Sequence, residues 1–556
     1  MKLAEKMRFE LKRLFIKCYC ISIAISLVSC ALVVTPTGGP KDLKPPVVVQ
    51  YQPDSAATNF DGHKIKISFD EFIQLKDLQG QLVISPPLVH NPDIKAHLKT
   101  LNITFKDTLK PNTTYAFNFG TAVADLNEGN SLDGFKYVFS TGPYLDSLVL
   151  TGQVKDANTQ APQKAILVML YDQNQDSLPF KQLPSYFGKT KENGTFKITN
   201  IKPGKYKVVA LKDVNSNYKY DSPDESIGYL DTLINLQRNT SIGLNLFKEA
   251  PRKQYLKRSW TPEYGHLQVI FNRKAIEPQF VILENHTNLS PPSISMVSWT
   301  SHHDTADIWM PSYASDSIHM VVYESQKVLD TIHLEMPAKT SKQRKFKFSL
   351  LNSNGSPSFD PNQTFQLQFN HPVKAVNPQL ITANYPIPKT KTLDSTLKLP
   401  FTPINFPSKP NQTGLKINWE PDSSYVLTFL KGAVTDIYDN KSDSTQIKLR
   451  VRPLNYYGTL MLSVKLPQNS PSIIQLVDEK ENVWRSQKIN TDTLINFDYL
   501  SPNTYRIKYI KDENNDGEWT TGDYLQHRQP EPVIYFSTPI IVRSNWDLEQ
   551  EWKVKP

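Results

Sequence analysis

Residues 115–130 read YAFNFGTAVADLNEGN, and residues 424–440 read SYVLTFLKGAVTDIYDN. Each stretch begins with alternating residues, a pattern that predicts a β-strand with one buried face. A turn rich in Asp, Asn and Gly follows each strand. The second stretch repeats the first with one residue inserted, so the sequence predicts the same β-unit twice in one chain.

The rest of the chain has the same texture. Short alternating runs bounded by Pro, Asn, Asp and Gly recur, and no stretch after Cys30 keeps a helical apolar period over a dozen residues. The 556 residues suffice for several domains of about 100–200 residues each. The sequence therefore predicts an all-β chain of tandem β-sandwiches behind a signal peptide.

A second internal repeat extends the first. Residues 196–224 align without a gap on residues 495–523 at a constant offset of 299, with Pro203 matching Pro502 and Tyr206 matching Tyr505. A pair of domains has therefore been duplicated, with a connector between the copies. The predicted order is a signal peptide (1–29), a lipidated tether (30–46), a first Ig-like domain (47–143), a first small sandwich (148–247), a connector β-domain (255–338), a second Ig-like domain (346–453) and a second small sandwich with a C-terminal extension (455–556).

The N-terminus carries an export signal. A basic segment precedes an apolar run from Cys18 to Val28, which is too short to span a bilayer and fits a secretory signal. The run ends in Leu27-Val28-Ser29-Cys30, which resembles the lipobox of bacterial lipoproteins. This resemblance implies that Cys30 is lipidated and becomes the mature N-terminus. The alternative is an ordinary signal peptide with a chance cysteine.

Composition excludes several classes of function. Cys18, Cys20 and Cys30 are the only cysteines, so the exported chain has no pair for a disulfide and no catalytic thiol. Removing residues 1–29 lowers the formal net charge from +9 to +5, which does not favour nucleic acid as a partner. The sequence also lacks G-x-S-x-G, H-E-x-x-H and G-x-G-x-x-G motifs, so we expect no enzymatic activity.

The repeated segment ends in a candidate calcium loop. In the second copy, oxygen-bearing residues fall at positions 1, 3, 5, 7, 9 and 12 of a twelve-residue loop: Asp512, Asn514, Asp516, Glu518 (through its carbonyl), Thr520 and Asp523. Gly517 stands at the turn position 6. Calcium requires six to eight oxygens from a tightly folded loop, and this spacing supplies them.

The first copy carries a weaker version of this loop. The same places hold Asp213, Asn215, Asn217, Lys219 (through its carbonyl), Asp221 and Asp224. Tyr218 replaces the glycine, and both copies end in Asp rather than the longer Glu. Both loops follow a strand, so neither is a helix-flanked EF-hand. The alternative in each case is a polar turn without metal.

Two other polar clusters are interpreted as structural. Asp70 and Glu71 are adjacent in a strand pattern, so they point to opposite faces and do not converge on one substrate atom. His302-His303-Asp304 has no third ligand at a recognisable spacing, which favours a solvated loop over a metal site.

Three resemblances add to this interpretation. The closing segments of residues 47–143, with "AVAD" and "FSTG", resemble the bacterial Ig-like domain of the surface-layer type. Residues 148–247 resemble the transthyretin-like, carboxypeptidase-regulatory β-sandwich, a module that is rarely an enzyme. The PTGGPKD tether and the domain order resemble a family of Ig-like-domain outer-membrane lipoproteins of Gram-negative bacteria.

The family resemblance implies a lipid anchor and an accessory role in a complex that assembles outer-membrane proteins or exports surface proteins. We therefore expect a non-catalytic scaffold that binds other outer-membrane proteins. The alternative is a glycan-binding or adhesive lipoprotein, in which exposed tryptophans and tyrosines stack on sugars. Calcium loops favour the cell surface, whereas the lack of an acidic cluster after Cys30 favours the periplasmic face.

Overall fold

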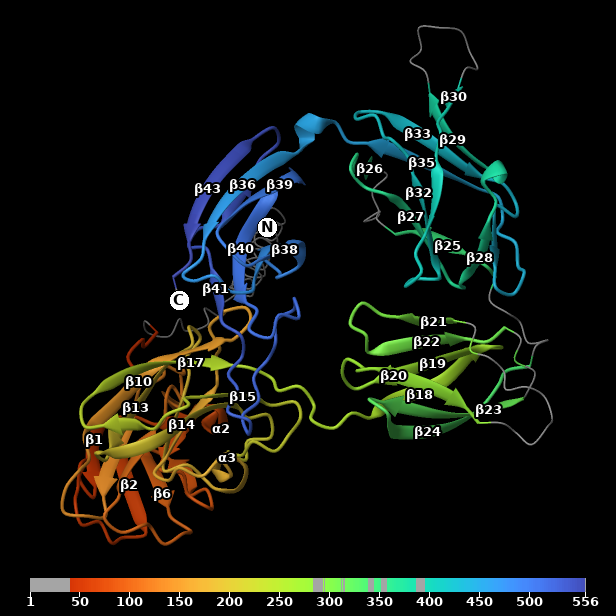
Figure 1. Cartoon of the computed structure of the whole chain (residues 1–556). Coiled ribbons are helices and arrows are strands. Elements are labelled where there is room, and N and C mark those ends of the chain that lie inside the picture. The colour runs from red at the N-terminus through yellow and green to blue at the C-terminus, as the bar shows by residue number, and fades with distance from the viewer. Residues whose placement is uncertain are drawn as a thin grey trace, which may run out of the picture. The chain divides into compact units, whose positions relative to one another are not determined.

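The computed structural model describes residues 41–283, 294, 296–311, 313, 316–338, 345–351, 358–386 and 396–555. The regular secondary structure of these residues is almost entirely β-strand, which confirms the predicted all-β class (Figure 1). Cys30, the predicted signal peptide and most of the predicted tether lie outside the described residues. Within the described part of the chain, no helix is long and apolar enough to cross a membrane.

The chain divides into two compact units, residues 1–145 and residues 146–556. The first unit contains the first Ig-like domain, whose larger sheet has the order β1-β2-β6-β5. The strands of this sheet are β1 (Val48–Gln52), β2 (Lys64–Phe69), β5 (Asp93–His97) and β6 (Thr100–Thr104). The facing sheet is β4-β7-β9, from β4 (Val83–Ser85), β7 (Thr114–Asn118) and β9 (Lys136–Ser140). A short pair, β3 (Ile73–Leu75) with β8 (Val123–Asp125), and helix α2 (Leu78–Gln81) complete the domain.

The core of the first Ig-like domain follows the alternation in its sequence. In β2, Ile65, Ile67 and Phe69 point inward, while Lys64 and Lys66 are exposed. Tyr115 in β7 is buried, and its hydroxyl accepts a hydrogen bond from Lys110 N at 2.8 Å. Inward side chains of both sheets therefore build one core, as expected of a sandwich.

The second unit begins with the first small sandwich, which has two sheets. One sheet is β13-β10-β17, from β10 (Leu148–Asp156), β13 (Thr195–Ile201) and β17 (Thr240–Leu246). The other has the order β12-β11-β14-β15, and β16 also pairs with β14. Its members are β11 (Leu167–Tyr171), β12 (Tyr186–Lys189), β14 (Gly204–Lys212), β15 (Ser226–Tyr229) and β16 (Ile234–Leu236), with helix α3 (Leu178–Lys181) between β11 and β12.

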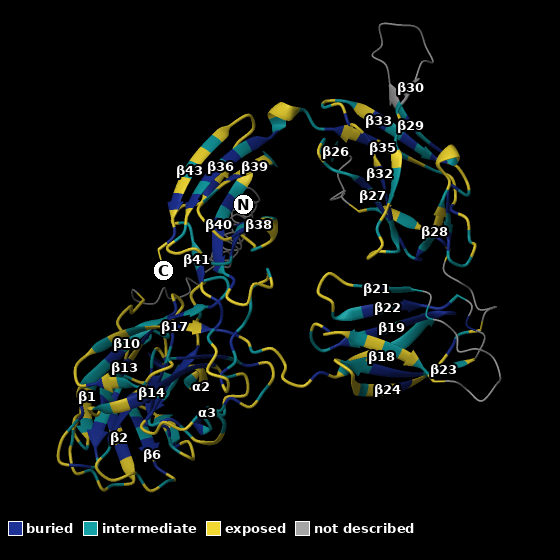
Figure 2. Ribbon diagram, in the orientation of Figure 1, coloured by how far each residue is buried: buried dark blue, intermediate teal, exposed yellow. Residues whose placement is uncertain are grey.

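The second small sandwich has the same strand order in both sheets, as its duplicated sequence predicts. The first sheet is β39-β36-β43, and the second is β38-β37-β40-β41 with β42 on β40. The strands are β36 (Gly458–Lys465), β37 (Ser472–Val477), β38 (Val483–Ile489), β39 (Thr493–Leu500), β40 (Asn503–Lys511), β41 (Val533–Tyr535), β42 (Ile540–Val542) and β43 (Asp547–Lys553). The central strands β14 and β40 are largely buried (Figure 2). In both domains the first and last strands are parallel neighbours, β10 with β17 and β36 with β43.

The connector domain is also made of two sheets. Its sheets are β18-β19-β22-β21 and β20-β23-β24. The strands are β18 (Leu256–Glu263), β19 (His266–Phe271), β20 (Pro278–Ile282), β21 (Met296–Trp299), β22 (Thr305–Trp309), β23 (Ser317–Glu324) and β24 (Lys327–Glu335). Buried apolar residues such as Leu267, Ile308 and Met320 lie between the two sheets.

The second Ig-like domain repeats the plan of the first. Its sheets are β25-β27-β32-β31, β26-β35-β33-β29-β30 and the pair β28-β34. The strands are β25 (Phe348–Leu350), β26 (Ser358–Phe359), β27 (Phe365–Phe369), β28 (Val373–Val376), β29 (Ile381–Pro386), β30 (Thr396–Lys398), β31 (Thr402–Asn405), β32 (Gln412–Lys416), β33 (Ser424–Phe429), β34 (Val434–Asp436) and β35 (Thr445–Val451). Two 3-10 turns, η1 (Pro378–Leu380) and η2 (Leu454–Tyr456), lie before β29 and after β35.

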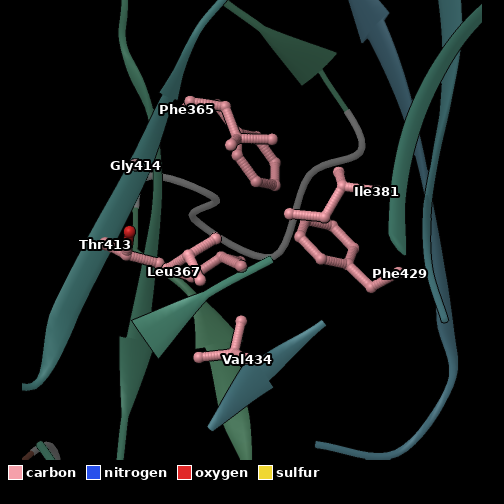
Figure 3. A pocket seen from close by; sticks show the side chains of 9 residues that line it. Phe365, Leu367, Ile381, Thr413, Gly414, Phe429 and Val434 are labelled. Carbon is pink, nitrogen blue, oxygen red and sulfur yellow. The ribbon is translucent and has the colours of Figure 1, made fainter. Parts of the chain in front are cut away.

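The core of the second Ig-like domain contains one small apolar pocket. Phe365 and Leu367 of β27, Ile381 of β29 and Phe429 of β33 point into it (Figure 3). The pocket has no room for a water molecule. It is therefore a packing feature and not a ligand site.

Candidate functional site

The loop after β40 brings together four of the side chains predicted to bind calcium. The Asn514 side-chain nitrogen donates to Thr520 Oγ1 at 2.8 Å and to Asp516 Oδ2 at 3.1 Å. Asp512 is buried, and its two carboxylate oxygens accept from Asp516 N at 3.0 Å and Gly517 N at 2.9 Å. Backbone N–H groups therefore donate hydrogen bonds to both oxygens of Asp512, the residue at the first predicted ligand position.

A residue that the sequence analysis missed closes this loop. Glu531 is buried, and its carboxylate accepts from Glu513 N and Thr520 N, both at 2.8 Å. Burial raises the pKa of Glu531 above its ordinary value, against the lowering effect of these N–H donors, and the nearby Asp512 carboxylate raises it further. Glu531 thus closes the loop through hydrogen bonds, and the role of Asp523 as a calcium ligand stays a prediction.

The first loop is built in the same way. Asp213 accepts from Ser216 N at 2.7 Å and Tyr218 N at 2.8 Å, and the Asn215 and Asn217 side chains both donate to Asp221. Glu225, which is also buried, accepts from the backbone N–H groups of residues 214, 221 and 222. Glu225 and Glu531 are therefore equivalent in the two copies.

The two copies differ at position 6 of the loop, where the second has Gly517 and the first has Tyr218. Gly517 has φ +82° and Tyr218 has φ +62°, so both copies need the left-handed backbone that favours glycine. The Tyr218 ring packs edge-on against Phe187, with 5.0 Å between the centroids. This packing holds the strained position in the first copy.

The other predicted ligands make different contacts. Asp224 pairs with Lys248 at 3.0 Å, and the Asp523 carboxylate lies 3.4 Å from Arg252 and accepts from Gln526 N. The Glu518 side chain pairs with Lys274 at 3.0 Å, and Lys219 donates its backbone N–H to Asn217. Among the described residues, no three His, Cys, Asp or Glu side chains are placed to hold a metal ion. The loops as they stand fit hydrogen-bonded turns, and calcium binding stays a prediction.

The second copy contains an inserted segment directly after its loop. Tyr229 pairs with Val209 across β15 and β14, and Tyr535 pairs with Lys508 across β41 and β40. The offset between the copies is 299 in β14 and β40, but it is 306 between β15 and β41. Seven residues, 524–530, have therefore been inserted between the loop and Glu531.

This inserted segment docks on the first small sandwich. Tyr524 is fully buried, with its ring 5.0 Å from that of Tyr229 and 5.9 Å from that of Phe180. Gln529 donates to Asp231 Oδ1 at 2.9 Å and to the carbonyl of Tyr229 at 3.2 Å. The two copies are therefore joined by a segment that only one of them possesses.

Polar contacts flank the buried tyrosine. His527 lies 3.1 Å from Asp176, which also pairs with the buried Lys207. Lys508, which is buried where the first copy has Val209, donates to Asn158 at 2.7 Å. Burial lowers the pKa of Lys508, so its charge depends on this contact and on Glu481 at 3.6 Å. The joint combines one aromatic anchor with polar contacts around it, although the hydroxyls of Tyr229 and Tyr524 have no hydrogen-bond partner among the described residues.

A second joint links the connector domain to the second Ig-like domain. Glu263 Oε1 lies 3.2 Å from His371 Nε2, and His371 Nδ1 lies 2.7 Å from Asp436 Oδ2. On the other side, His266 lies 3.8 Å from Glu263 and 2.8 Å from Asp307. Burial alone would lower the pKa of His371, but its hydrogen bonds to Asp436 and Glu263 outweigh this effect and raise the pKa to about 9.

The two clusters interpreted as structural occupy turns. The carboxylate of Asp70 accepts from Val47 N at 2.8 Å, so it fixes the entry of β1. Asp304 accepts from the hydroxyls of Thr300 and Thr305, and the His303 ring stacks on Trp299 at 4.7 Å. Both arrangements stabilise a loop through local contacts.

Comparison with known proteins supports part of this description. Residues 42–141 match the profile of a family described as a bacterial Ig-like domain. The match covers nearly the same residues as the predicted first Ig-like domain. No curated protein matches the sequence.

Solved structures give only distant matches. The S-layer protein rSbsC is 13% identical, with 86% of this chain and 67% of that chain covered and a TM-score of 0.14. The Bacillus anthracis TIE protein is 11% identical, with coverage of 94% and 76% and a TM-score of 0.14. BcpA, the major pilin subunit of Bacillus cereus, is 8% identical, with coverage of 73% and 99% and the same TM-score. At such TM-scores these similarities carry no argument about function.

Proposed function

We propose that this protein is a non-catalytic, lipid-anchored scaffold of the outer membrane whose β-domains hold other membrane proteins. The observation that carries the proposal is the docking of residues 524–530 on the first small sandwich. An insertion that buries Tyr524 completely fixes one domain against another. A fixed spacing between domains is what a scaffold requires.

The chemistry of the acidic loops supports the same function. The carboxylates of Asp512 and Glu531 accept hydrogen bonds from backbone N–H groups, as do those of Asp213 and Glu225 in the first copy. Carboxylates held in this way stabilise a loop and are poorly placed as general acids or bases. These groups therefore give rigidity to the joint that lies beside them.

The anchor follows from the N-terminal sequence. A basic segment, a short apolar run and Leu27-Val28-Ser29-Cys30 favour lipidation at Cys30. We expect labelled palmitate to enter the wild-type protein and not the Cys30→Ser variant. Equal labelling of both proteins would show that Cys30 is not the site of lipidation. Protease treatment of intact cells then separates the cell surface from the periplasmic face.

The scaffold role is tested by purification of the tagged protein from detergent-solubilised membranes. We expect defined outer-membrane proteins to co-purify with the wild type in constant ratio, and to be reduced in Tyr524→Ala, which loosens the joint. Tyr144→Ala serves as the control, because Tyr144 is 54% exposed. Equal recovery of partners with both variants would show that partner binding does not depend on the joint, and it would contradict this proposal.

Glycan binding is the second candidate function. Trp484 and Trp546 are partly exposed, and the Arg543 guanidinium lies 4.8 Å from the Trp546 ring centroid. An exposed tryptophan beside a cation is a suitable platform for an acidic sugar. Binding of the wild type to surface polysaccharide that is lost in Trp546→Ala, without any co-purifying protein, would favour this function over the scaffold.

A further inference from the structure

Four large apolar side chains are exposed at one end of the first Ig-like domain. Val47, Phe72, Leu98 and Leu126 are 59%, 44%, 62% and 53% exposed, and we call them the apolar rim. Single exposed apolar residues are normal on a protein surface, whereas a contiguous group indicates a contact surface. The question is therefore whether these four lie together.

Backbone hydrogen bonds place the four residues side by side. Asp70 N donates to the Val47 carbonyl at 3.0 Å, Ile73 N to the Leu98 carbonyl at 3.0 Å, and Leu126 N to the Phe72 carbonyl at 2.8 Å. Three separate segments thus converge on residues 70–73. The rim is one surface, assembled where β2 ends and β3 begins.

The described chain enters the domain at this same end. The Asn130 side chain donates to the Asp42 carbonyl at 3.0 Å and to the Lys44 carbonyl at 3.3 Å. This contact fixes residues 42–44 beside the turn that follows Leu126, and Leu43 between them is 78% exposed. Eleven residue-to-residue steps separate Cys30 from Lys41, a length that spans at most about 40 Å. The end that carries the rim is therefore the end nearest to the lipid attachment.

Charges around the rim nearly balance one another. The lysines at this end are Lys41, Lys44, Lys76 and Lys99, and the acidic residues are Asp42, Asp70, Glu71, Asp125 and Glu128. Lys99 extends over the Phe72 ring, with its Nζ 5.6 Å from the centroid and bonded to the Asp70 carbonyl. A rim with so little net charge suits a zwitterionic surface better than a strongly charged protein partner.

We propose that the apolar rim rests on the lipid surface next to the anchor and so sets the orientation of the first Ig-like domain. This inference rests on the proposed lipidation of Cys30. Tethering supplies a high effective concentration, so four apolar side chains suffice for a contact that would be weak in a free protein. The anchor then keeps the domain at the membrane, and the rim fixes its orientation relative to the lipid surface.

The test uses a probe that reports contact with lipid. Since the three cysteines lie at or before residue 30, the chain from residue 31 onward is free of cysteine. We would attach this chain to vesicles of the zwitterionic lipids phosphatidylethanolamine and phosphatidylcholine by an N-terminal histidine tag on a nickel-chelating lipid. A polarity-sensitive fluorophore would be placed on Leu98→Cys and, as the control, on Val89→Cys.

Val89 is a matched control because it lies at the opposite end of the same sheet. It is 77% exposed, and it precedes β5 at Asp93, which pairs with Thr104, whereas Leu98 follows His97, which pairs with Thr100. The length of the strand, about 15 Å, separates the two positions. We expect spin-labelled lipids to quench the probe at residue 98 at least threefold more than at residue 89. Introducing Phe72→Glu and Leu126→Glu together should abolish the difference.

Other outcomes would overturn the proposal. Equal quenching at both positions would show that the rim does not face lipid. A change of the probe at residue 98 that depends on protein concentration, without vesicles, would assign the rim to a second copy. Palmitate labelling of Cys30 is measured separately, so failure of the anchor is distinguishable from failure of the rim.

Discussion

His371 Nδ1 lies 2.7 Å from Asp436 Oδ2, and both side chains are completely buried in the second Ig-like domain. The register of the first Ig-like domain places Glu71 and Asp125 at the same two positions, since Ile73 pairs with Asp125 as Val373 pairs with Asp436. An ion pair in one copy therefore corresponds to two carboxylates in the other. Glu263 of the connector domain lies beside the ion pair, so the histidine serves both its own domain and the joint.

The raised pKa of His371 predicts how stability depends on pH. Because the pKa of the folded state is raised from 6.5 to about 9, this contribution to stability is fully present below pH 6.5 and is lost as the pH rises through about 9. We expect His371→Gln to lower the free energy of unfolding by about 3 kcal/mol at pH 6, because it leaves buried carboxylates without their partner.

Thermal melts between pH 6 and pH 10 measure this effect. His97→Gln is the control, because His97 is exposed in the first Ig-like domain. The same loss of stability between pH 6.5 and 9 in the wild type and in His371→Gln would contradict the assignment.

In the first Ig-like domain, where Glu71 and Asp125 take the places of the ion pair, we expect a substitution to increase stability. Burial raises the pKa of Glu71, and Asp125, Asp70, Asp42 and Glu128 raise it further. The charged form of Glu71 is therefore disfavoured in the folded state, so Glu71→Gln should raise the melting temperature at pH 7. The gain should vanish below pH 4, where the wild-type group is protonated as well. A lower melting temperature at pH 7 would mean that Glu71 makes a favourable contact instead.

Two substitutions of Tyr524 should distinguish the contribution of its ring packing from that of its hydroxyl. Its hydroxyl has no hydrogen-bond partner among the described residues, so Tyr524→Phe should change the free energy of unfolding by less than about 1 kcal/mol. Tyr524→Ala should cost about 3–5 kcal/mol, because it leaves a cavity between the two small sandwiches. Hydrogen exchange in residues 226–229 reports opening of the joint. Equal effects of the two substitutions would assign the stabilisation to the hydroxyl.

Glu531 and Asp523 give a matched pair of carboxylates at one loop. Glu531→Ala should destabilise the second small sandwich by about 2 kcal/mol, because the backbone N–H groups of residues 513 and 520 lose their buried acceptor. Asp523→Ala should cost less, because it removes an ion pair with the partly exposed Arg252. Denaturant unfolding of the two variants measures the difference, and the reverse order would restore Asp523 as the closing residue.

Calcium binding is tested on the same loop. If the loop binds calcium with a dissociation constant of about 10⁻⁴–10⁻³ M, millimolar calcium should stabilise the protein by about 1 kcal/mol. Asp512→Ala should abolish this response, whereas Asp523→Ala should preserve it, because the Asp523 carboxylate faces Arg252. Identical melting temperatures with calcium and with chelator in all three proteins would identify the loop as a turn only.

Alternation and repetition were sufficient to predict much of the fold. Lys64 to Phe69 alternates without interruption and forms β2 as expected, and the motif at residues 115–130 leads to the same pairing of β3 with β8 that its repeat gives β28 with β34. These features depend on local side-chain period, which a sequence displays directly.

The joints could not be predicted in this way. Alignment at a single offset stops at Asp523, so it assigned the closing position to that residue and missed Glu531 beyond the insertion. A second gapless match, Glu225 to Tyr229 against Glu531 to Tyr535, was the available signal. The buried contacts of His371 with Glu263 join residues more than a hundred positions apart, and no local pattern announces such a pair.

Parallel pairing of the first and last strands gives each small sandwich a particular response to force. In β10 with β17 and in β36 with β43, the chain enters along one strand and leaves along its parallel neighbour. Tension between the two ends of such a domain pulls these strands past one another. The seven residue pairs in each case then bear load simultaneously and do not open one at a time. A chain held by lipid at one end and by a partner at the other would therefore resist stretching at these two sandwiches, and single-molecule pulling would detect them as the last domains to yield.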